Sequence, residues 1–300
     1  MQSDYPLKRQ VKTSVAIPAS LVSDIPHLRE KTLRIGLIGR ALAIFRINEI
    51  IIYPDLPSRD QTKDAALIEA ILSYMETPQY LRKRLFKIRP DLRYVGILPP
   101  LRTPHHPTQN REKDLKIGEH REGVVVSSDE KGVHVDIGVE RPIFVPNVQI
   151  KTNSRVTVRI REKGKNLIGE ITNPDEVKFY WGYRVTVSRS SLGRILKDQR
   201  YDLVIATSRR GDSIAKIADK LLSRWERSRW VLIAFGSPTQ GLQEIVGQEK
   251  IKLERAVHFI VNTIPNQGVK TVRTEEAIYA TLAALNILTS DRKRSRPHNF

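Results

Sequence analysis

The spacing of apolar residues in the first hundred positions has the periods of an α/β protein. Leu33, Leu37, Ala41 and Ile44 recur at helical intervals, whereas the runs around Val15 and Ile51 are continuous and apolar, as in strands buried on both faces. The predicted elements of this part are strands at 14–18 and 49–53 and helices at 31–47, 64–75 and 78–87.

The pattern changes after residue 98. A loop rich in proline, histidine and threonine (102–110) precedes short stretches in which apolar and polar residues alternate, with turn sequences such as Asp129-Glu130-Lys131-Gly132 between them. The predicted strands are 121–127, 132–137, 141–145, 155–161 and 166–171. Such a series of five short strands indicates a small antiparallel β-barrel of the oligonucleotide-binding (OB) type.

The α/β rhythm resumes after residue 177. The predicted elements are strands at 184–187, 202–207, 230–235 and 257–262 and helices at 192–197, 213–223 and 275–288, the last with Thr274 as its N-cap. We therefore expect an α/β fold in which residues 1–98 and 178–300 form one split domain. Residues 99–177 would form an OB-like barrel domain inserted into it.

Composition narrows the class of protein. The chain contains no cysteine, which excludes a disulfide framework, a cysteine-bound metal centre and a thiol nucleophile. No apolar run approaches the ~20 residues of a membrane span, and Met1–Lys12 lacks the apolar stretch of a secretory signal. We expect a cytoplasmic protein with no membrane partner.

The charge is strongly basic and unevenly distributed. Lysine and arginine outnumber aspartate and glutamate by 51 to 33, and the net charge of +18 favours a polyanionic partner. Residues 101–177 carry a net charge of only +1, whereas residues 178–230 carry +8. A basic surface without a specific partner is the alternative, and a nucleic-acid footprint is the better hypothesis. The densest basic runs are Arg82–Arg93, Arg209-Arg210, Arg224–Arg229 and Arg292–Arg294.

One candidate for chemistry is Arg40. At about 100° per residue, its side chain falls about 20° from Leu33 and about 40° from Ile44, inside the apolar stripe of the predicted helix. A buried guanidinium is costly unless it is paired or lines a cavity, so Arg40 could face a phosphate or a developing negative charge. The alternative is an arginine whose stem passes the end of the stripe into solvent.

Two loops that leave predicted strands are the other candidates. Residues 235–242 (Phe-Gly-Ser-Pro-Thr-Gln-Gly-Leu) leave a buried strand at the carboxyl edge, where α/β sheets bind ligands, although an ordinary strand-to-helix turn is at least as common. Residues 262–276 form a long polar connection that ends at a helix N-terminus. Loops of this length are more often functional than merely connecting.

Other candidates are weaker. His105-His106 lies in a proline-rich loop without a spaced carboxylate or cysteine, so we expect no metal site there. No serine has the sequence of a nucleophile elbow. Only His134 and Phe144 of the predicted barrel could stack on bases, so a barrel that contacts RNA would hold its backbone or shape.

Taken together, the segments resemble one family over nearly the whole chain. The markers are Tyr74–Arg82, Gly96–Pro107, Tyr180–Tyr183 and Thr271–Ala277, together with the three candidate segments. The chain resembles the SPOUT (α/β-knot) RNA methyltransferases, in particular the archaeal and eukaryotic branch with an inserted barrel. The resemblance implies a trefoil knot, S-adenosylmethionine as cofactor, and a homodimer with its active site at the subunit interface.

The resemblance also implies the residues of the site. The cofactor would lie bent between the knot loops, held largely by backbone groups. The residues expected to bind it are Thr207, Phe235, Gly236, Ser237, Gly241, Leu242, Asn262, Thr263, Ile264, Pro265, Asn266, Gly268 and Thr271. Arg40 falls on the motif that supplies an arginine to the substrate in related families, and Arg273 is a second candidate for orienting the target base or its phosphate.

The sequence departs from related families at two positions. Arg34 stands where they carry an asparagine, and Pro238 stands where they often place an acid. The resemblance implies methylation of ribosomal RNA, with uridine N3 as a candidate target atom. The departures keep open a non-catalytic RNA-binding or ribosome-assembly factor on the same fold. A DNA-binding protein is a distant third hypothesis, because no recognition-helix motif is present.

Overall fold

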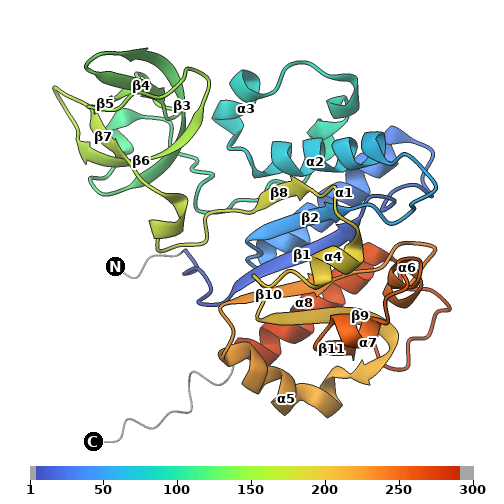
Figure 1. Cartoon of the computed structure of the whole chain (residues 1–300). Helices are drawn as coiled ribbons and strands as arrows, with labels where there is room; N and C mark the ends of the chain where they lie inside the picture. Colours follow the sequence, from blue (N-terminus) through green and yellow to red (C-terminus); the bar gives the residue numbers. More distant parts are fainter. Residues whose placement is uncertain (1–4, 291–300) are drawn as a thin grey trace, which may run out of the picture. The chain divides into compact units, whose positions relative to one another are not determined.

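The computed structural model describes residues 5–290, which form two compact units (Figure 1). The parallel-sheet unit comprises residues 9–73, 93–99 and 183–290, and the barrel unit comprises residues 5–8, 74–92 and 100–182. The basic run Arg292–Arg294 lies outside the described residues. The predicted fold class, an α/β sheet domain with an inserted small barrel, is confirmed.

Six strands of the parallel-sheet unit lie in the order β11-β9-β10-β1-β2-β8, and every neighbouring pair is parallel. Central strands such as β1 and β10 are buried on both faces, as their continuous apolar sequences require. The bounds are β1 (Lys12–Pro18), β2 (Glu49–Tyr53), β8 (Arg184–Val187), β9 (Leu203–Ser213), β10 (Trp230–Ala234) and β11 (Phe259–Asn262).

Helices complete this unit. The helices α1 (Leu28–Ile44) and α5 (Ile214–Glu226) both contact α8 (Thr274–Ser290). The short helices α4 (Leu192–Leu196), α6 (Leu242–Gly247) and α7 (Leu253–Ala256) share one core cluster with alternate residues of the strands, such as Ala16, Leu232 and Ala234. The helix α2 (Thr62–Glu76) follows β2. Neither α6 nor α7 was predicted, because helices of six and four residues are too short to show a period.

The helix α1 buries a different face from the one that its leucines suggest. Leu33, Leu37 and Ile44 are 44%, 40% and 49% exposed, whereas Ala41 is buried, so three of the four residues of the predicted stripe face outward in the single chain. The buried face is made of the small residues Gly36, Gly39 and Ala41 together with three larger apolar side chains, Ile35, Ile38 and Leu42. A Cβ at Gly36 would lie only 2.6 Å from Leu98 Cδ2, so the glycine allows segment 93–99 to approach the helix closely.

In the barrel unit, five strands close in the order β3-β4-β5-β7-β6, with β6 pairing back onto β3. The pairing of β5 with β7 is parallel, so the barrel is mixed and not purely antiparallel. Its interior is filled by alternate apolar residues such as Val125, Val135 and Ile160. The bounds are β3 (His120–Asp129), β4 (Gly132–Asp136), β5 (Ile143–Pro146), β6 (Arg155–Glu162) and β7 (Ile168–Ile171).

The helix α3 (Gln79–Leu85) packs on the barrel. The Tyr80 hydroxyl donates to the Glu122 carbonyl at 2.7 Å, and Arg84 Nε lies 2.8 Å from Asp136 Oδ2. These contacts explain why residues 74–92 group with the barrel, whereas the sequence boundaries of 98/99 and 177/178 had placed them with the parallel sheet. Short 3₁₀ turns occur at Pro90–Leu92, Val95–Ile97, Glu112–Asp114 and Pro174–Glu176.

We expect Gly123→Ala to destabilise the barrel by about 1–3 kcal/mol, because overpacking a closed interior forces neighbours to move. A Cβ at Gly123 would lie 2.4 Å from Val135 Cγ1 and 3.0 Å from the Asp136 carbonyl. The matched control is Gly247→Ala in α6, where no atom lies within 4 Å of the added carbon. Urea unfolding should show a change of under about 0.5 kcal/mol for this control. Equal midpoints for both variants would contradict the packing argument.

Candidate active site

Three neighbouring parallel strands end at one edge of the sheet and border a cavity of about 370 Å³. Its walls come from residues 207–210 of β9, from the segments that leave β10 and β11, and from the first turn of α6 and the first two turns of α8. Carboxyl edges of parallel sheets are where α/β folds bind ligands, and the volume lies in the range of roughly 300–1,000 Å³ that is usual for cofactor pockets.

Most of the residues predicted to bind a cofactor line this cavity. Those that do are Thr207, Phe235, Gly236, Ser237, Gly241, Leu242, Asn262, Thr263, Ile264 and Thr271. Pro265, Asn266 and Gly268 do not border it, although they lie in the same loop. Sequence reasoning missed the contributions of β9 and of α8, chiefly Ser208, Arg209, Arg210, Thr274, Ala277 and Thr281.

The loop after β10 is anchored at both ends. Tyr53 donates its buried hydroxyl to the Phe235 carbonyl at 2.6 Å, and burial raises the pKa of this phenol well above its usual value, so it remains a donor. The Ser237 and Gln240 backbones close a turn at 2.9 Å, and the Gly241 amide donates to Glu244 Oε2 at 3.1 Å. A Cβ at Gly236 would lie 3.0 Å from the Gln240 carbonyl, which explains a glycine inside so tight a loop.

The loop after β11 is held by side-chain amides and hydroxyls. Asn262 Oδ1 accepts from the Ile264 amide at 2.9 Å, and the Thr263 and Thr281 hydroxyls lie 2.8 Å apart. The helix α8 begins at Thr274, whose hydroxyl donates to the Gly236 carbonyl at 3.4 Å instead of capping the helix as predicted. The polar residues of this connection therefore tie it to α8 and to the loop after β10.

The two predicted catalytic arginines do not border the cavity. Arg40 lies on the exposed face of α1 and close enough to Tyr279 to lower the pKa of that phenol, although burial keeps the pKa raised overall. Arg273 is exposed and sits between Val272 and Thr274, which are both lining residues. Arg273 is thus adjacent to the cavity in sequence, whereas Arg40 lies on α1, which contacts α8.

Arg34 and Pro238, the two residues that depart from related families, lie in an ion-pair network and in the cavity wall, respectively. Arg34 Nη1 lies 2.8 Å from Asp24 Oδ1, and its Nε lies 3.3 Å from Glu275 Oε1, so this arginine links α1 to the first turn of α8. Pro238 is a lining residue of the cavity. An asparagine at position 34 could not pair with both carboxylates, because it is shorter and uncharged.

The composition of the cavity wall fits S-adenosylmethionine. The half-buried Ile264 and Val272 offer apolar surface for the flat adenine ring, whereas Thr207, Asn262 and Thr271 offer polar groups for the ribose hydroxyls and the amino-acid end of the cofactor. Thr207 already donates to the Ala234 carbonyl at 3.0 Å, which fixes the orientation of its hydroxyl. The cavity therefore has the mixed character that a nucleoside cofactor requires.

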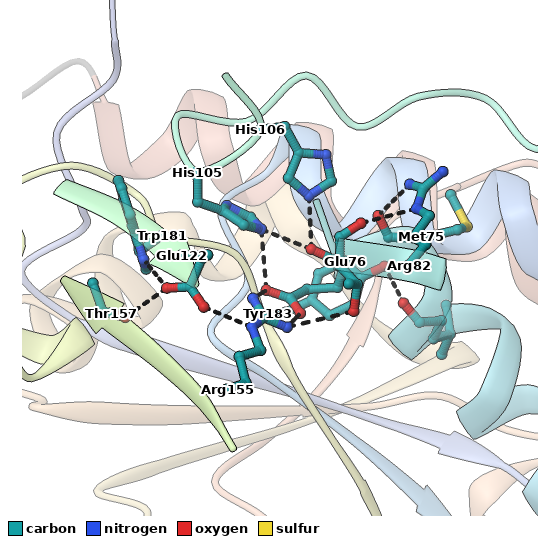
Figure 2. Close-up of polar contacts among 12 residues, drawn as sticks. Met75, Glu76, Arg82, His105, His106, Glu122, Arg155, Thr157, Trp181 and Tyr183 are labelled. Atoms are coloured by element: carbon teal, nitrogen blue, oxygen red, sulfur yellow. Dashed lines mark hydrogen bonds and ion pairs between the residues drawn. The ribbon is translucent and has the colours of Figure 1, made fainter. Parts of the chain in front are cut away.

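A second polar cluster lies in the barrel unit, where three of the sequence markers meet (Figure 2). Glu76 forms a two-pronged ion pair with Arg155, at 2.5 and 3.0 Å, and Arg155 Nε also lies 2.6 Å from Glu122 Oε2. Trp181 donates to Glu122 Oε1 at 2.6 Å. His105 and His106 both reach the Glu76 carbonyl, at 2.8 and 2.6 Å.

The polar cluster around Glu76 stabilises the structure of the barrel unit. Burial alone would raise the pKa of Glu76, but Arg155 and the donor from His105 outweigh it and hold the pKa at about 2. Gly182 has a φ of +88°, and a Cβ there would lie 2.6 Å from His105 Cε1 and 2.7 Å from Glu76 Oε1. The markers 74–82, 96–107 and 180–183 thus contribute residues that pack around one buried ion pair, with no part in the cavity.

Within residues 5–290, no three histidine, aspartate or glutamate side chains are grouped so that they could hold a metal ion. In the same range, no helix has the length and apolar character needed to cross a bilayer.

We expect the barrel unit to lose stability as the pH falls below 6.5, because it contains a buried histidine that is neutral in the folded state. Burial and the neighbouring His105 lower the pKa of His106 to about 3 from 6.5, so the unfolded chain binds the extra proton first. The stabilisation is complete above pH 6.5 and is lost as the pH falls toward 3. Glu76 adds a loss between pH 4.5 and about 2.

His106→Gln should flatten the decline in the urea midpoint below pH 6.5, because glutamine does not titrate. His27→Gln removes an exposed imidazole and should leave the profile unchanged. Parallel profiles for wild type and His106→Gln would contradict this assignment.

Comparison with known proteins identifies related sequences over most of the chain. The sequence profile of the family described as "Putative RNA methyltransferase" matches residues 12–285. An uncharacterized protein of Haloarcula marismortui is 31% identical over 92% of this chain and 99% of its own length. The 28S rRNA (uridine-N(3))-methyltransferases of mouse (Mus musculus) and human (Homo sapiens) are 33% and 32% identical over 92% of this chain, and over 76% and 78% of their own lengths.

Among solved structures, a probable methylase family protein from Haemophilus influenzae aligns with 97% of this chain and 71% of its own, with a TM-score of 0.38 and 11% identity. The match of the family profile spans both units and the cavity described above. The chain belongs to this RNA methyltransferase family and is an RNA methyltransferase.

Proposed function

We propose that this enzyme transfers a methyl group from S-adenosylmethionine to N3 of a uridine in ribosomal RNA. The observation that carries the proposal is the single cavity at the carboxyl edge of the sheet, where ten of the thirteen predicted cofactor residues meet. The nature of the target is supported by the mouse and human relatives, which are named as 28S rRNA (uridine-N(3))-methyltransferases.

When bound, S-adenosylmethionine supplies an electrophilic methyl group, whose bonding electron pair stays on sulfur while nitrogen forms the new bond. The protein must then position the uridine and favour loss of its N3 proton to water. Arginine cannot take that proton at neutral pH, but its positive charge stabilises the uridine anion. Arg273 is exposed and adjacent in sequence to the lining residues Val272 and Thr274, and we assign that role to it.

A homodimer is part of the proposal. Leu33, Leu37 and Ile44 form an exposed apolar stripe on α1, and Arg40 lies on the same face. In a dimer formed through this stripe, Arg40 would lie at the subunit interface, where the resemblance to SPOUT enzymes places an active site. The trefoil knot and a cytoplasmic location belong to the same proposal.

The second candidate is an RNA-binding or assembly factor without methyl transfer. It is favoured by Arg34, which is engaged in two ion pairs at the position of the family asparagine, and by Pro238 in the cavity wall. This candidate predicts salt-dependent RNA binding without incorporation of methyl groups.

We expect Ala277→Trp to abolish cofactor binding or to weaken it at least tenfold, because the indole would fill the cavity from α8. Titration calorimetry with S-adenosylmethionine should show micromolar binding for the wild type. The matched control is Ala215→Trp, which places the same side chain on an exposed turn of α5 away from the cavity. Absence of wild-type binding at millimolar cofactor would contradict the proposal.

The protein is incubated with tritiated S-adenosylmethionine and with ribosomal RNA from cells that lack the gene. The label should be incorporated into the RNA, and mass spectrometry should identify the product as 3-methyluridine. Arg273→Gln should lower kcat by about 10²-fold or more, because it removes a charge that stabilises the reacting base, and should leave cofactor affinity unchanged. Incorporation of no label, with cofactor binding intact, would favour the assembly-factor alternative.

A further inference from the structure

The strand β9 leaves its partner β11 for a short stretch. The pairing passes from Ile260 with Ala206 directly to Val261 with Asp212, so residues 207–211 lie outside the ladder. We call residues 207–211 the β9 bulge. The predicted strand ends at Thr207, so the sequence placed only this one residue of the β9 bulge at the cavity.

Two local features shape the bulge. Gly211 touches the backbone of β11, where an added Cβ would lie 2.6 Å from the Ile260 carbonyl oxygen and 2.8 Å from the Val261 amide nitrogen. Ser208 Oγ accepts from the Arg210 amide at 3.1 Å, a hydroxyl-stabilised turn. Gly211, at the end of the β9 bulge, thus contacts β11, whereas Arg209 and Arg210, near its centre, are exposed.

Arg209 fastens the bulge to the loop after β11. Its Nη1 donates to the Lys270 carbonyl at 3.1 Å, and its own carbonyl accepts from Asn262 Nδ2 at 2.9 Å. Gln267 Nε2 also donates to the Val269 carbonyl at 2.9 Å, within the same loop. These hydrogen bonds of Arg209 hold the β9 bulge and the loop after β11 together, so Arg210 and Lys270 line the same cavity.

The side chains of Arg210 and Lys270 are exposed, and neither has a hydrogen bond or an ion pair to any residue between 5 and 290. The charged residues of the cavity wall are Arg209, Arg210, Lys270 and Glu244. Glu244 is already engaged, because its Oε2 accepts from the Gly241 amide. The mouth of the cavity is therefore positively charged, with two cations available to an incoming anion.

We propose that Arg210 and Lys270 form a seat for backbone phosphates of the RNA nucleotide that enters the cavity, and that Arg209 is the positioning residue that holds the seat in place. The inference rests on the proposed function and names the contact by which that site holds its substrate. A guanidinium binds phosphate through two parallel N–H bonds, and an ammonium binds it as a point charge. Two separate cations fit the successive charges of a phosphodiester chain better than the single carboxylate of the cofactor.

Binding of fluorescein-labelled decauridylate, followed by anisotropy between about 50 and 200 mM KCl, tests the seat. Arg210→Gln and Lys270→Gln should each weaken binding about fivefold and reduce the slope of log K against log salt by about 0.7, the value for one phosphate contact on a single strand. Calorimetric affinity for S-adenosylmethionine should change by less than about twofold. The double variant should show both losses, with a higher KM for RNA and a nearly unchanged kcat.

Arg255→Gln is the matched charge control, because Arg255 is exposed on α7 before β11 begins, at the opposite edge of the sheet. It should leave the salt slope unchanged. Arg209→Gln should weaken both RNA and cofactor binding, because it releases the loop after β11. Arg209→Lys should restore cofactor binding, since an ammonium can donate to the same Lys270 carbonyl.

An unchanged salt slope in the double variant would overturn the seat. A loss of cofactor affinity without a change in RNA binding would also overturn it, because the two cations would then serve the cofactor carboxylate. The proposed function is tested separately. If the wild-type protein bound no S-adenosylmethionine, the proposed function would fail, but the change in salt slope between the wild type and the variants would still support the phosphate site. If Arg255→Gln reduced the salt slope of RNA binding to the same extent, the change would reflect the net charge of the protein and would contradict the proposed phosphate site.

Discussion

The parallel alignment of β9, β10 and β11 is the constraint on which the site depends. Because neighbouring parallel strands point the same way, the segments that follow Ala206, Ala234 and Asn262 must all emerge at one edge. Segments that lie far apart along the sequence therefore become walls of one cavity. Hydrogen bonds between these segments, such as Thr274 to Gly236 and Asn262 to Arg209, then determine the shape of that cavity.

The elements of regular length could be predicted because burial on one or two faces leaves a period in the sequence. The strands β2 and β8 match their expected bounds, and all five barrel strands lie where alternation placed them. The mixed pairing of β5 with β7 could not be predicted, since alternation shows which face is buried and carries no information on strand direction. The β9 bulge was missed for a related reason, because Ser208, Arg209 and Arg210 leave the ladder and show no period.

The interpretation of Arg40 depended on the assumption that leucines mark the buried face of a helix. In α1 the buried face includes Gly36 and Gly39, and Gly36 allows Leu98 to pack closely against the helix, while Leu33 and Leu37 remain at the surface. A hydrophobic period alone cannot distinguish a stripe that meets the core from one that is available to another chain. The cofactor loops were easier to identify, because a polar connection after a buried strand has few structural alternatives.

The division of the chain has a consequence for how the protein can be made and handled. The backbone passes from one unit to the other five times between residues 8 and 183. Neither unit is a contiguous fragment, so a simple truncation would remove strands or helices from both. Each unit must also close contacts between segments far apart in sequence, which slows folding and leaves incomplete intermediates open to proteolysis. Expression of either unit by itself would therefore require several separate segments of the chain to be joined.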